Sequence, residues 1–211
     1  LAERFEKATG IPVVLRTDSE GSKTTGLIGR LRDLKDRPDG DVFWNSELSA
    51  TLLLAKECLL APYVSPAAAS IPSLYKDPGG YWTGFGCRAR VLVFNTNRIK
   101  KDDAPRTVEE LAEPKWRGRF CMARPMFGTT RSHFVSLVLA LGEERGFALV
   151  RKLRDNALAG DPRKPWLLDG NGPVRERVAE GYFDLGLTDT DDVYVAQARG
   201  APVDLVFIGQ T

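Results

Sequence analysis

The feature of the sequence that most constrains the fold is an alternation of short apolar runs with amphipathic patterns. The apolar runs, which are typical of strands, cover 11–17, 41–44, 119–124, 182–189 and 203–209. The amphipathic patterns have the period of a helix and cover 1–9, 23–35, 46–57, 128–141, 143–156, 171–181 and 191–200. This order predicts an α/β fold with mostly parallel sheets flanked by helices, because parallel strands need a crossover between them.

The alternation is interrupted once, which predicts two lobes. The turn sequence DPGG at 77–80 is followed by an extended stretch, 81–97, that is too long for one ordinary strand. We therefore expect a first lobe, a crossing hinge strand, a second lobe and a hinge strand that returns to the first lobe. These four parts cover 1–83, 84–97, 98–202 and 203–211.

Composition excludes several classes of function. A net charge of +2 leaves no electrostatic footprint for nucleic acid, so we expect no such partner. Three cysteines without a CxxC spacing and a single histidine argue against a zinc or iron–sulfur site. The cysteines are either small buried apolar residues or include one disulfide, between Cys87 and Cys121. No run of about 18 apolar residues offers a bilayer span.

Polar side chains gather where predicted strands give way to helices. These junctions lie at 18–22, 45–46, 128–130, 170–172 and 189–192. In open α/β sheets, ligands bind beyond the carboxyl ends of the strands, where the N-termini of helices converge. We therefore expect these junctions to form a binding site.

The junction TDTDD at 188–192 has two interpretations. One aspartate can cap a helix, and further carboxylates in the first turn suit the helix dipole. Three carboxylates can also bind a hard cation or the ammonium groups of an organic ligand. We expect a ligand contact among Asp189, Thr190, Asp191 and Asp192, with Asp191 and Asp192 as the candidates for a metal.

Two glycine-containing helix starts have the same two interpretations. Gly128, Thr129 and Thr130 place free N–H groups where they attract an anion, or the threonines only cap the helix. Asn171 is likewise a cap or a ligand donor, and the glycines beside it let a backbone approach a small molecule closely.

Nothing in the sequence pairs a nucleophile with a base. Walker and G-x-S-x-G motifs are absent, and His133 has no evident triad partners. We expect a binding protein without a cofactor rather than an enzyme. Two alternatives are a magnesium-dependent enzyme that uses Asp189, Asp191 and Asp192, and a regulatory effector-binding domain.

An ordered set of segments resembles a known family. LAERFEKATGIPV, DVFWNSE, GFGCRARVLVFNTN, PKWRGRFCMARPMFGTT and FDLGLTDTDDVYVA are similar to the extracellular solute-binding proteins of ABC importers. The nearest group is the ferric-iron-binding type of the type 2 periplasmic-binding-protein fold. The resemblance implies two lobes that close on a ligand, a periplasmic (or secreted, membrane-associated) monomer after removal of a signal peptide, and a membrane permease and ATPase as partners. It also implies that a first strand and a C-terminal segment are lacking here.

Position by position, the resemblance retains the scaffold but not the iron ligands. Ser46 stands where ferric-binding relatives have a glutamate, and Asp191 and Asp192 stand where they have two adjacent tyrosines. Asp189 replaces an asparagine. Matches to relatives are found at Arg88, Arg90, Gly128, Thr129 and Asn171. Carboxylates and hydroxyls without phenolates suit a small polar solute or a metal ion or complex, with Fe(III) as one candidate.

The expected function is thus capture of such a solute for an importer. The residues that we expect to contact the ligand are Ser19, Ser22, Asn45, Ser46, Arg88, Gly128, Thr129, Thr130, Asn171, Asp189, Thr190, Asp191 and Asp192.

Overall fold

The computed structural model of the chain describes residues 1–18, 25–46, 48–126 and 128–209. Contacts divide the chain into two compact units, Leu1–Leu59 and Leu60–Thr211. Residues 60–83, which the sequence pattern placed in the first lobe, group with the second unit. The lobe and hinge boundaries given above stay predictions.

The described residues of the first unit form three helices, α1 (Ala2–Thr9), α2 (Thr25–Asp33) and α3 (Leu48–Lys56). All three were predicted within two residues at each end. Gly10 ends α1 in the left-handed conformation, with φ of 73°, and its N–H bonds to Glu6 O.

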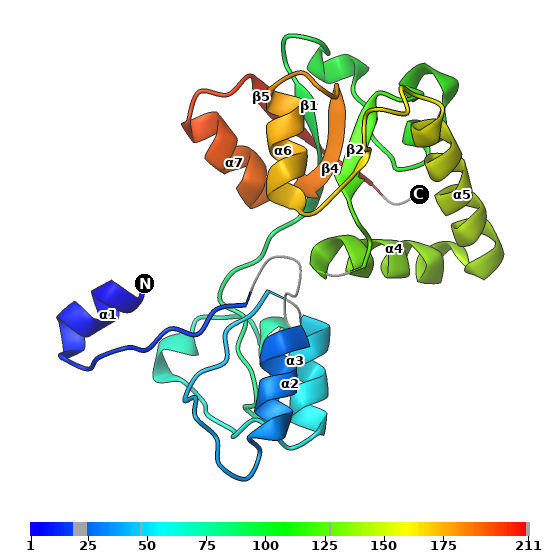
Figure 1. Cartoon of the computed structure of the whole chain (residues 1–211). Coiled ribbons are helices and arrows are strands. Elements are labelled where there is room, and N and C mark those ends of the chain that lie inside the picture. Colours follow the sequence, from blue (N-terminus) through cyan, green and yellow to red (C-terminus); the bar gives the residue numbers. More distant parts are fainter. Residues whose placement is uncertain (19–24, 47, 127, 210–211) are drawn as a thin grey trace. The chain divides into compact units, whose positions relative to one another are not determined.

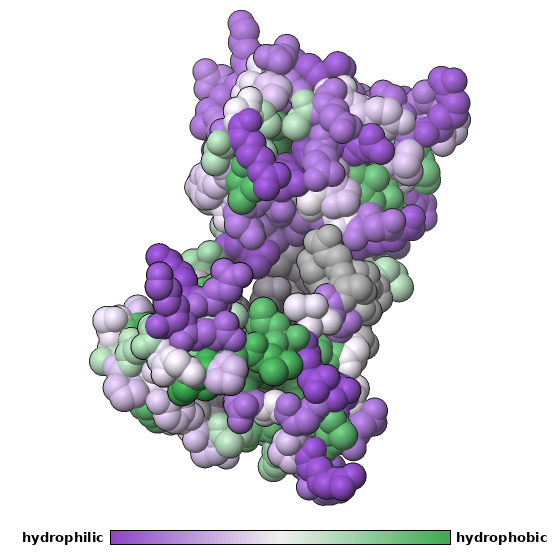
Figure 2. All heavy atoms as spheres, turned by 60° about the vertical axis from the view of Figure 1, so that its left-hand side comes forward, coloured by the Kyte–Doolittle hydropathy of each residue, from purple (hydrophilic) through white to green (hydrophobic). Residues whose placement is uncertain are grey.

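The strands predicted at 11–17 and 41–44 do not form in the described part of the first unit. A strand needs a neighbour for its backbone groups, and the described residues provide no ladder for these two segments. Their side chains are accordingly open to solvent, with Val14 83% and Val42 86% exposed. Apolar surface of this kind is green in Figure 2.

The second unit contains one five-stranded sheet with the order β3-β2-β4-β1-β5. Its strands are β1 (Arg90–Asn95), β2 (Phe120–Ala123), β3 (Leu167–Leu168), β4 (Leu185–Asp189) and β5 (Val203–Phe207). β2 is parallel to β3 and β4, whereas β1 is antiparallel to both β4 and β5. Four strands therefore run in one direction, and β1 alone runs against them.

Helices cover both faces of this sheet (Figure 1). They are α4 (Gly128–Leu141), α5 (Glu143–Leu158), α6 (Asn171–Ala179) and α7 (Thr190–Ala198), and each was predicted. Short 3-10 helices cover Pro66–Ala68, Ser73–Tyr75, Lys101–Asp103, Glu110–Ala112 and Pro114–Trp116. Within the described residues, no helix has the length and apolarity that crossing a bilayer requires.

The core is split into two layers by the sheet. Val91 and Val93 of β1 pack in a cluster with residues of α6 and α7, whereas Leu92 and Phe94 pack in a cluster with residues of α4 and α5. Both faces of β1 are buried, which explains why its sequence is a continuous apolar run rather than an alternating one.

Three predictions about the second unit need correction. Only Arg90–Asn95 of the extended stretch 81–97 forms a strand. The two-residue strand β3 was missed, because so short a segment carries no periodicity. The alternative of a disulfide between Cys87 and Cys121 is wrong, since both are free and Cys121 is buried in β2 while Cys87 is exposed.

Candidate functional site

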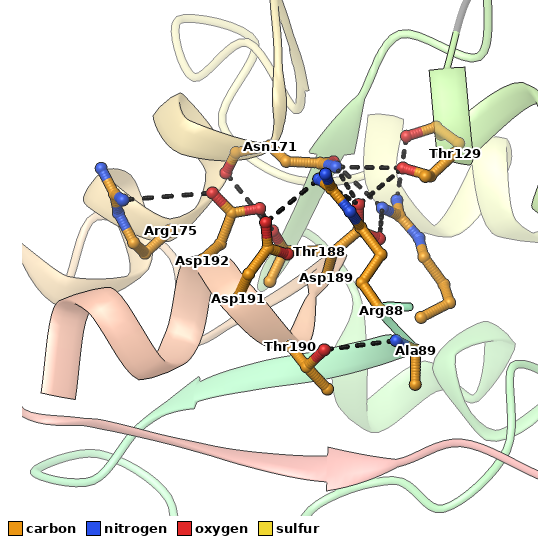
Figure 3. A network of polar contacts seen from close by, with 12 residues as sticks. Arg88, Ala89, Thr129, Asn171, Arg175, Thr188, Asp189, Thr190, Asp191 and Asp192 are labelled. Carbon is orange, nitrogen blue, oxygen red and sulfur yellow. Dashed lines mark hydrogen bonds and ion pairs between the residues drawn. The ribbon is translucent and has the colours of Figure 1, made fainter. Parts of the chain in front are cut away.

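Four segments bring polar side chains to one edge of the sheet. The parallel strands β2, β3 and β4 end at this edge and lead into α4, α6 and α7, so the three helices begin there. β1 is antiparallel and begins at the same edge, with Arg90 directly opposite Asp189 in the ladder. The topology therefore places arginines from the start of β1 beside the first residues of these helices (Figure 3).

Asp189 lies at the centre of the network and is 1% exposed. It is the N-cap residue of α7, yet its side chain makes no capping bond. Its carboxylate instead accepts hydrogen bonds from Thr129 Oγ1 at 2.7 Å, Asn171 Nδ2 at 2.8 Å and Arg90 Nη1 at 3.1 Å. The capping interpretation is thus wrong for Asp189, which holds together the starts of three helices and a strand.

Arg90 is the buried cation that compensates Asp189, and its side chain is 10% exposed. It also donates to Asn171 Oδ1, Thr130 Oγ1 and Leu187 O, each at 3.0 Å. Burial lowers the pKa of Arg90, and the Asp189 carboxylate acts against this effect. An ion pair this deep needs such hydrogen bonds because desolvation of both charges is costly.

Three further side chains form the more exposed part of the site. Arg88 Nη1 lies 3.1 Å from Asp191 Oδ2 and 3.8 Å from Asp189 Oδ2. Asp192 accepts a hydrogen bond from Thr188 Oγ1 at 3.1 Å, and Arg175 Nη1 lies 4.0 Å from it. Figure 3 shows Arg88 pointing toward the aspartates from the β1 side and Arg175 from α6.

The three aspartates have the chemistry of a hard-cation site. One carboxylate oxygen from each of Asp189, Asp191 and Asp192 lies within 4.8 Å of the others. Burial and the neighbouring Asp191 raise the pKa of Asp192, while the Thr188 hydroxyl and Arg175 act against this effect. Fe(III), Mg²⁺ and Ca²⁺ all prefer such oxygen donors.

His133 lies against the network on α4. Burial lowers its pKa to about 4, and the Arg90 charge contributes in the same direction. Its Nδ1 atom is buried without a hydrogen-bond partner among the described residues. A neutral imidazole of this kind supports the packing of α4 and is not a poised base at neutral pH.

The structure brings together most of the second-lobe residues that were predicted to bind ligand. The hydrogen bonds and ion pairs given above connect seven of them, which are Arg88, Thr129, Thr130, Asn171, Asp189, Asp191 and Asp192. Gly128 begins α4 with φ of 62°, a conformation that favours glycine. Thr190 has another role, because its hydroxyl accepts a hydrogen bond from Ala89 N at 3.2 Å. Ligand contact itself stays a prediction.

Four residues of the first lobe were also predicted to contact the ligand. Ser19 and Ser22 lie outside the described residues. Asn45 is half-buried and donates from Nδ2 to Thr51 Oγ1 at 2.7 Å, and Ser46 is exposed. Both belong to the first unit, and their part in the site stays a prediction.

The sequence analysis missed two residues of the site and the buried position of Arg90. Thr188 and Arg175, the partners of Asp192, were not singled out as site residues. Arg175 has a signal in the sequence, since it lies four residues after Asn171 and thus on the same helix face. The burial of Arg90 beneath the site depends on the strand register, which no local pattern reveals.

Comparisons with known proteins place this chain in a class. Residues 49–164 match the profile of the family described as bacterial extracellular solute-binding protein. The chain belongs to this family. It is 31% identical to iron uptake protein A1 of Synechocystis sp. over 192 residues, which are 90% of this chain and 50% of that protein.

Solved structures show the same fold. Iron-bound HitA from Pseudomonas aeruginosa superposes with a TM-score of 0.83 at 24% identity, over 99% of this chain and 64% of that one. The periplasmic binding protein AfuA from Actinobacillus pleuropneumoniae, with fructose-6-phosphate bound, gives 0.78 at 20% identity over 99% and 65%. The predicted type 2 periplasmic-binding-protein fold is confirmed. The chain spans about half the length of the curated relatives that it matches.

Proposed function

We propose that this chain forms part of the substrate-binding component of an ABC importer, which captures Fe(III) or an Fe(III) complex outside the cytoplasmic membrane and delivers it to a permease. The observation that carries the proposal is the family match over 49–164. Relatives named for iron support the choice of ligand, among them iron uptake protein A1 and the Fe(3+)-binding periplasmic protein of Serratia marcescens. The periplasmic location and the ATPase partner belong to the same proposal.

The donor set of the site supports a hard cation. Asp189, Asp191 and Asp192 offer carboxylate oxygens, and the Thr188 hydroxyl lies beside them. Such donors suit Fe(III), although a small polar solute with an ammonium group would meet the same carboxylates. The buried frame of Arg90, Asp189, Thr129 and Asn171 fixes these groups before ligand arrives, which reduces the ordering cost of binding.

The mechanism that we infer from the family is capture of the ligand by closure of two lobes. In this proposal the first lobe contributes Ser19, Ser22, Asn45 and Ser46. Ligand would shift the population only by its higher affinity for the closed form. Catalysis is not part of the proposal, because the family is described as binding solutes. Turnover of a phosphate ester that is lost in Asp191→Asn would overturn this view.

The test is the ligand of the freshly purified protein. Native mass spectrometry with metal analysis should find iron, and titration with ferric citrate should saturate at one ion per chain. Asp191→Ala together with Asp192→Ala should lower the affinity at least about tenfold, because two of three carboxylate ligands are lost. Asp102→Ala, at a fully exposed aspartate, is the matched control and should bind normally. A co-purified organic ligand without metal, or normal binding by the double variant, would contradict the proposal.

A further inference from the structure

Arg88 and Arg90 lie two residues apart, Arg90 at the start of β1 and Arg88 just before it, but they are held in different ways. Arg90 is 10% exposed and makes four hydrogen bonds, so it is part of the buried frame. Arg88 is 38% exposed and makes ion pairs with Asp191 and Asp189. Arg88 can therefore leave its partners without breaking the frame.

The position of Arg88 coincides with the place where a cation would bind. Its guanidinium group contacts two of the three carboxylates that could hold a metal ion, Asp191 at 3.1 Å and Asp189 at 3.8 Å. A metal ion and this guanidinium compete for the same oxygens. Their charges also repel each other at such distances, most strongly for a trivalent ion.

Arg88 changes the net charge that the site presents to a ligand. The three aspartates are opposed by Arg90, which is fixed, and by Arg88. Arg175 contributes little, because its guanidinium is 2.7 Å from Glu176 and only 4.0 Å from Asp192. Displacement of Arg88 therefore exposes a second negative charge at a site that otherwise carries one.

We propose that Arg88 is an internal counter-ion that a cationic ligand must displace from Asp191 and Asp189, and that it thereby limits the affinity of the site for cations. This inference rests on the proposed function, since it concerns the same carboxylates. The free energy needed to separate Arg88 from Asp191 and Asp189 is the same for every ion that displaces it, whereas an ion that binds beside Arg88 is repelled in proportion to its own charge. Arg88 thus lowers the affinity for every cation, and for a trivalent ion by at least as much as for a divalent one.

The test compares Arg88→Gln with the unmodified chain by calorimetric titration with terbium(III), a hard trivalent probe, and with Ca²⁺. Arg88→Gln should bind terbium(III) roughly tenfold more tightly at low salt and should gain no more than this factor for Ca²⁺. The gain should shrink in 1 M salt, which screens charges at these distances. Arg88→Lys, which keeps the charge, should bind like the unmodified chain.

Controls separate a charge effect from a structural one. Arg154→Gln removes an exposed arginine of α5, paired with Asp155 at 2.8 Å, and should leave both affinities unchanged. Adding Asp191→Asn to Arg88→Gln should reverse the gain. Equal or weaker binding by Arg88→Gln, or the absence of binding by both proteins, would overturn the inference. Binding of Fe(III) by the unmodified chain tests the proposed function separately, because it does not depend on the ratio between the two proteins.

Discussion

At the residue scale, the site divides into a buried frame and an exposed set. Asp189 and Arg90 belong to the frame, whereas Asp191 is 52% exposed and has Arg88 as its partner. A charge that is buried with its partner cannot be left alone without a large cost, whereas an exposed ion pair is worth little. Mutations in the frame should therefore cost much more stability than mutations in the exposed set.

The first prediction follows from this difference. Asp189→Ala leaves the buried Arg90 without its carboxylate and should lower the free energy of unfolding by about 3–5 kcal/mol. Asp191→Ala removes an exposed carboxylate and should change the same quantity by less than about 1 kcal/mol. Urea unfolding monitored by circular dichroism measures both. Similar losses in the two variants would contradict the division into frame and exposed set.

The second prediction concerns pH. His133 has a pKa of about 4 in the folded protein against 6.5 for a free histidine. The unfolded chain therefore binds a proton that the folded chain does not, so His133 makes stability fall as pH drops from about 6.5 to 4. The loss between pH 7 and pH 5 should be roughly 2 kcal/mol at most.

His133→Gln removes this titration and is the control. The difference between the free energies of unfolding at pH 7 and pH 5 should be smaller in the variant than in the unmodified chain. The raised pKa of Asp192 acts in the opposite sense, because its folded form takes up a proton more readily than its unfolded form. An unchanged pH dependence in His133→Gln would rule out His133 as its source.

At the scale of elements, the positions of the helix starts depend on how closely α6 packs against β4. Gly186 in β4 has no side chain, and a Cβ atom there would lie 2.5 Å from Val174 Cγ1 and 3.0 Å from Val178 Cγ2. Both valines lie on α6, whose first residue is Asn171. The glycine therefore sets the distance between this helix and the sheet.

Gly186→Ala should push α6 outward and lower the free energy of unfolding by about 1–3 kcal/mol, as overpacking does in other cores. It should also weaken ligand binding, because Asn171 moves away from Asp189. Gly29→Ala in α2, where no atom lies within 4 Å of the new Cβ, is the control and should be neutral or slightly stabilising. Chemical denaturation and ligand titration measure the two effects.

The elements that could be predicted from the sequence are those whose neighbours are local. The helices α4, α5, α6 and α7 follow from periodicity and turn residues, and all were found. Strands depend on partners far along the chain, so 11–17 and 41–44 were predicted as strands where the described structure has none. The grouping of Asp189 with Thr129 and Asn171 was expected from the junctions, whereas the depth of Arg90 required the register of β1.

At the scale of the whole molecule, the buried core is concentrated in the second unit. The two clusters of buried apolar residues are built from residues 91–206, whereas among the described residues of the first unit the buried apolar ones are Ile28, Ala50 and Leu54. Apolar side chains of 11–17, such as Val14, remain exposed. Local stability should therefore differ strongly between the two units.

Hydrogen exchange of the chain measures this difference. Amides of β1 and β4, which pair in the ladder, should exchange slowest, whereas those of 11–17 and 41–44 should exchange within the fastest class. The slowly exchanging amides of the second unit serve as the internal reference. Strong protection of 11–17 would contradict the prediction and would indicate a backbone partner for that segment.

The reversed direction of β1 has a consequence for how specificity can evolve. Because one strand enters where three others leave, the mouth of the sheet draws on four stretches of chain that are far apart in sequence. Each stretch can change its outermost side chain by a single substitution, while the deep pair beneath it keeps the domain folded. We therefore expect that the polar side chains at this edge can be changed one at a time without loss of the fold.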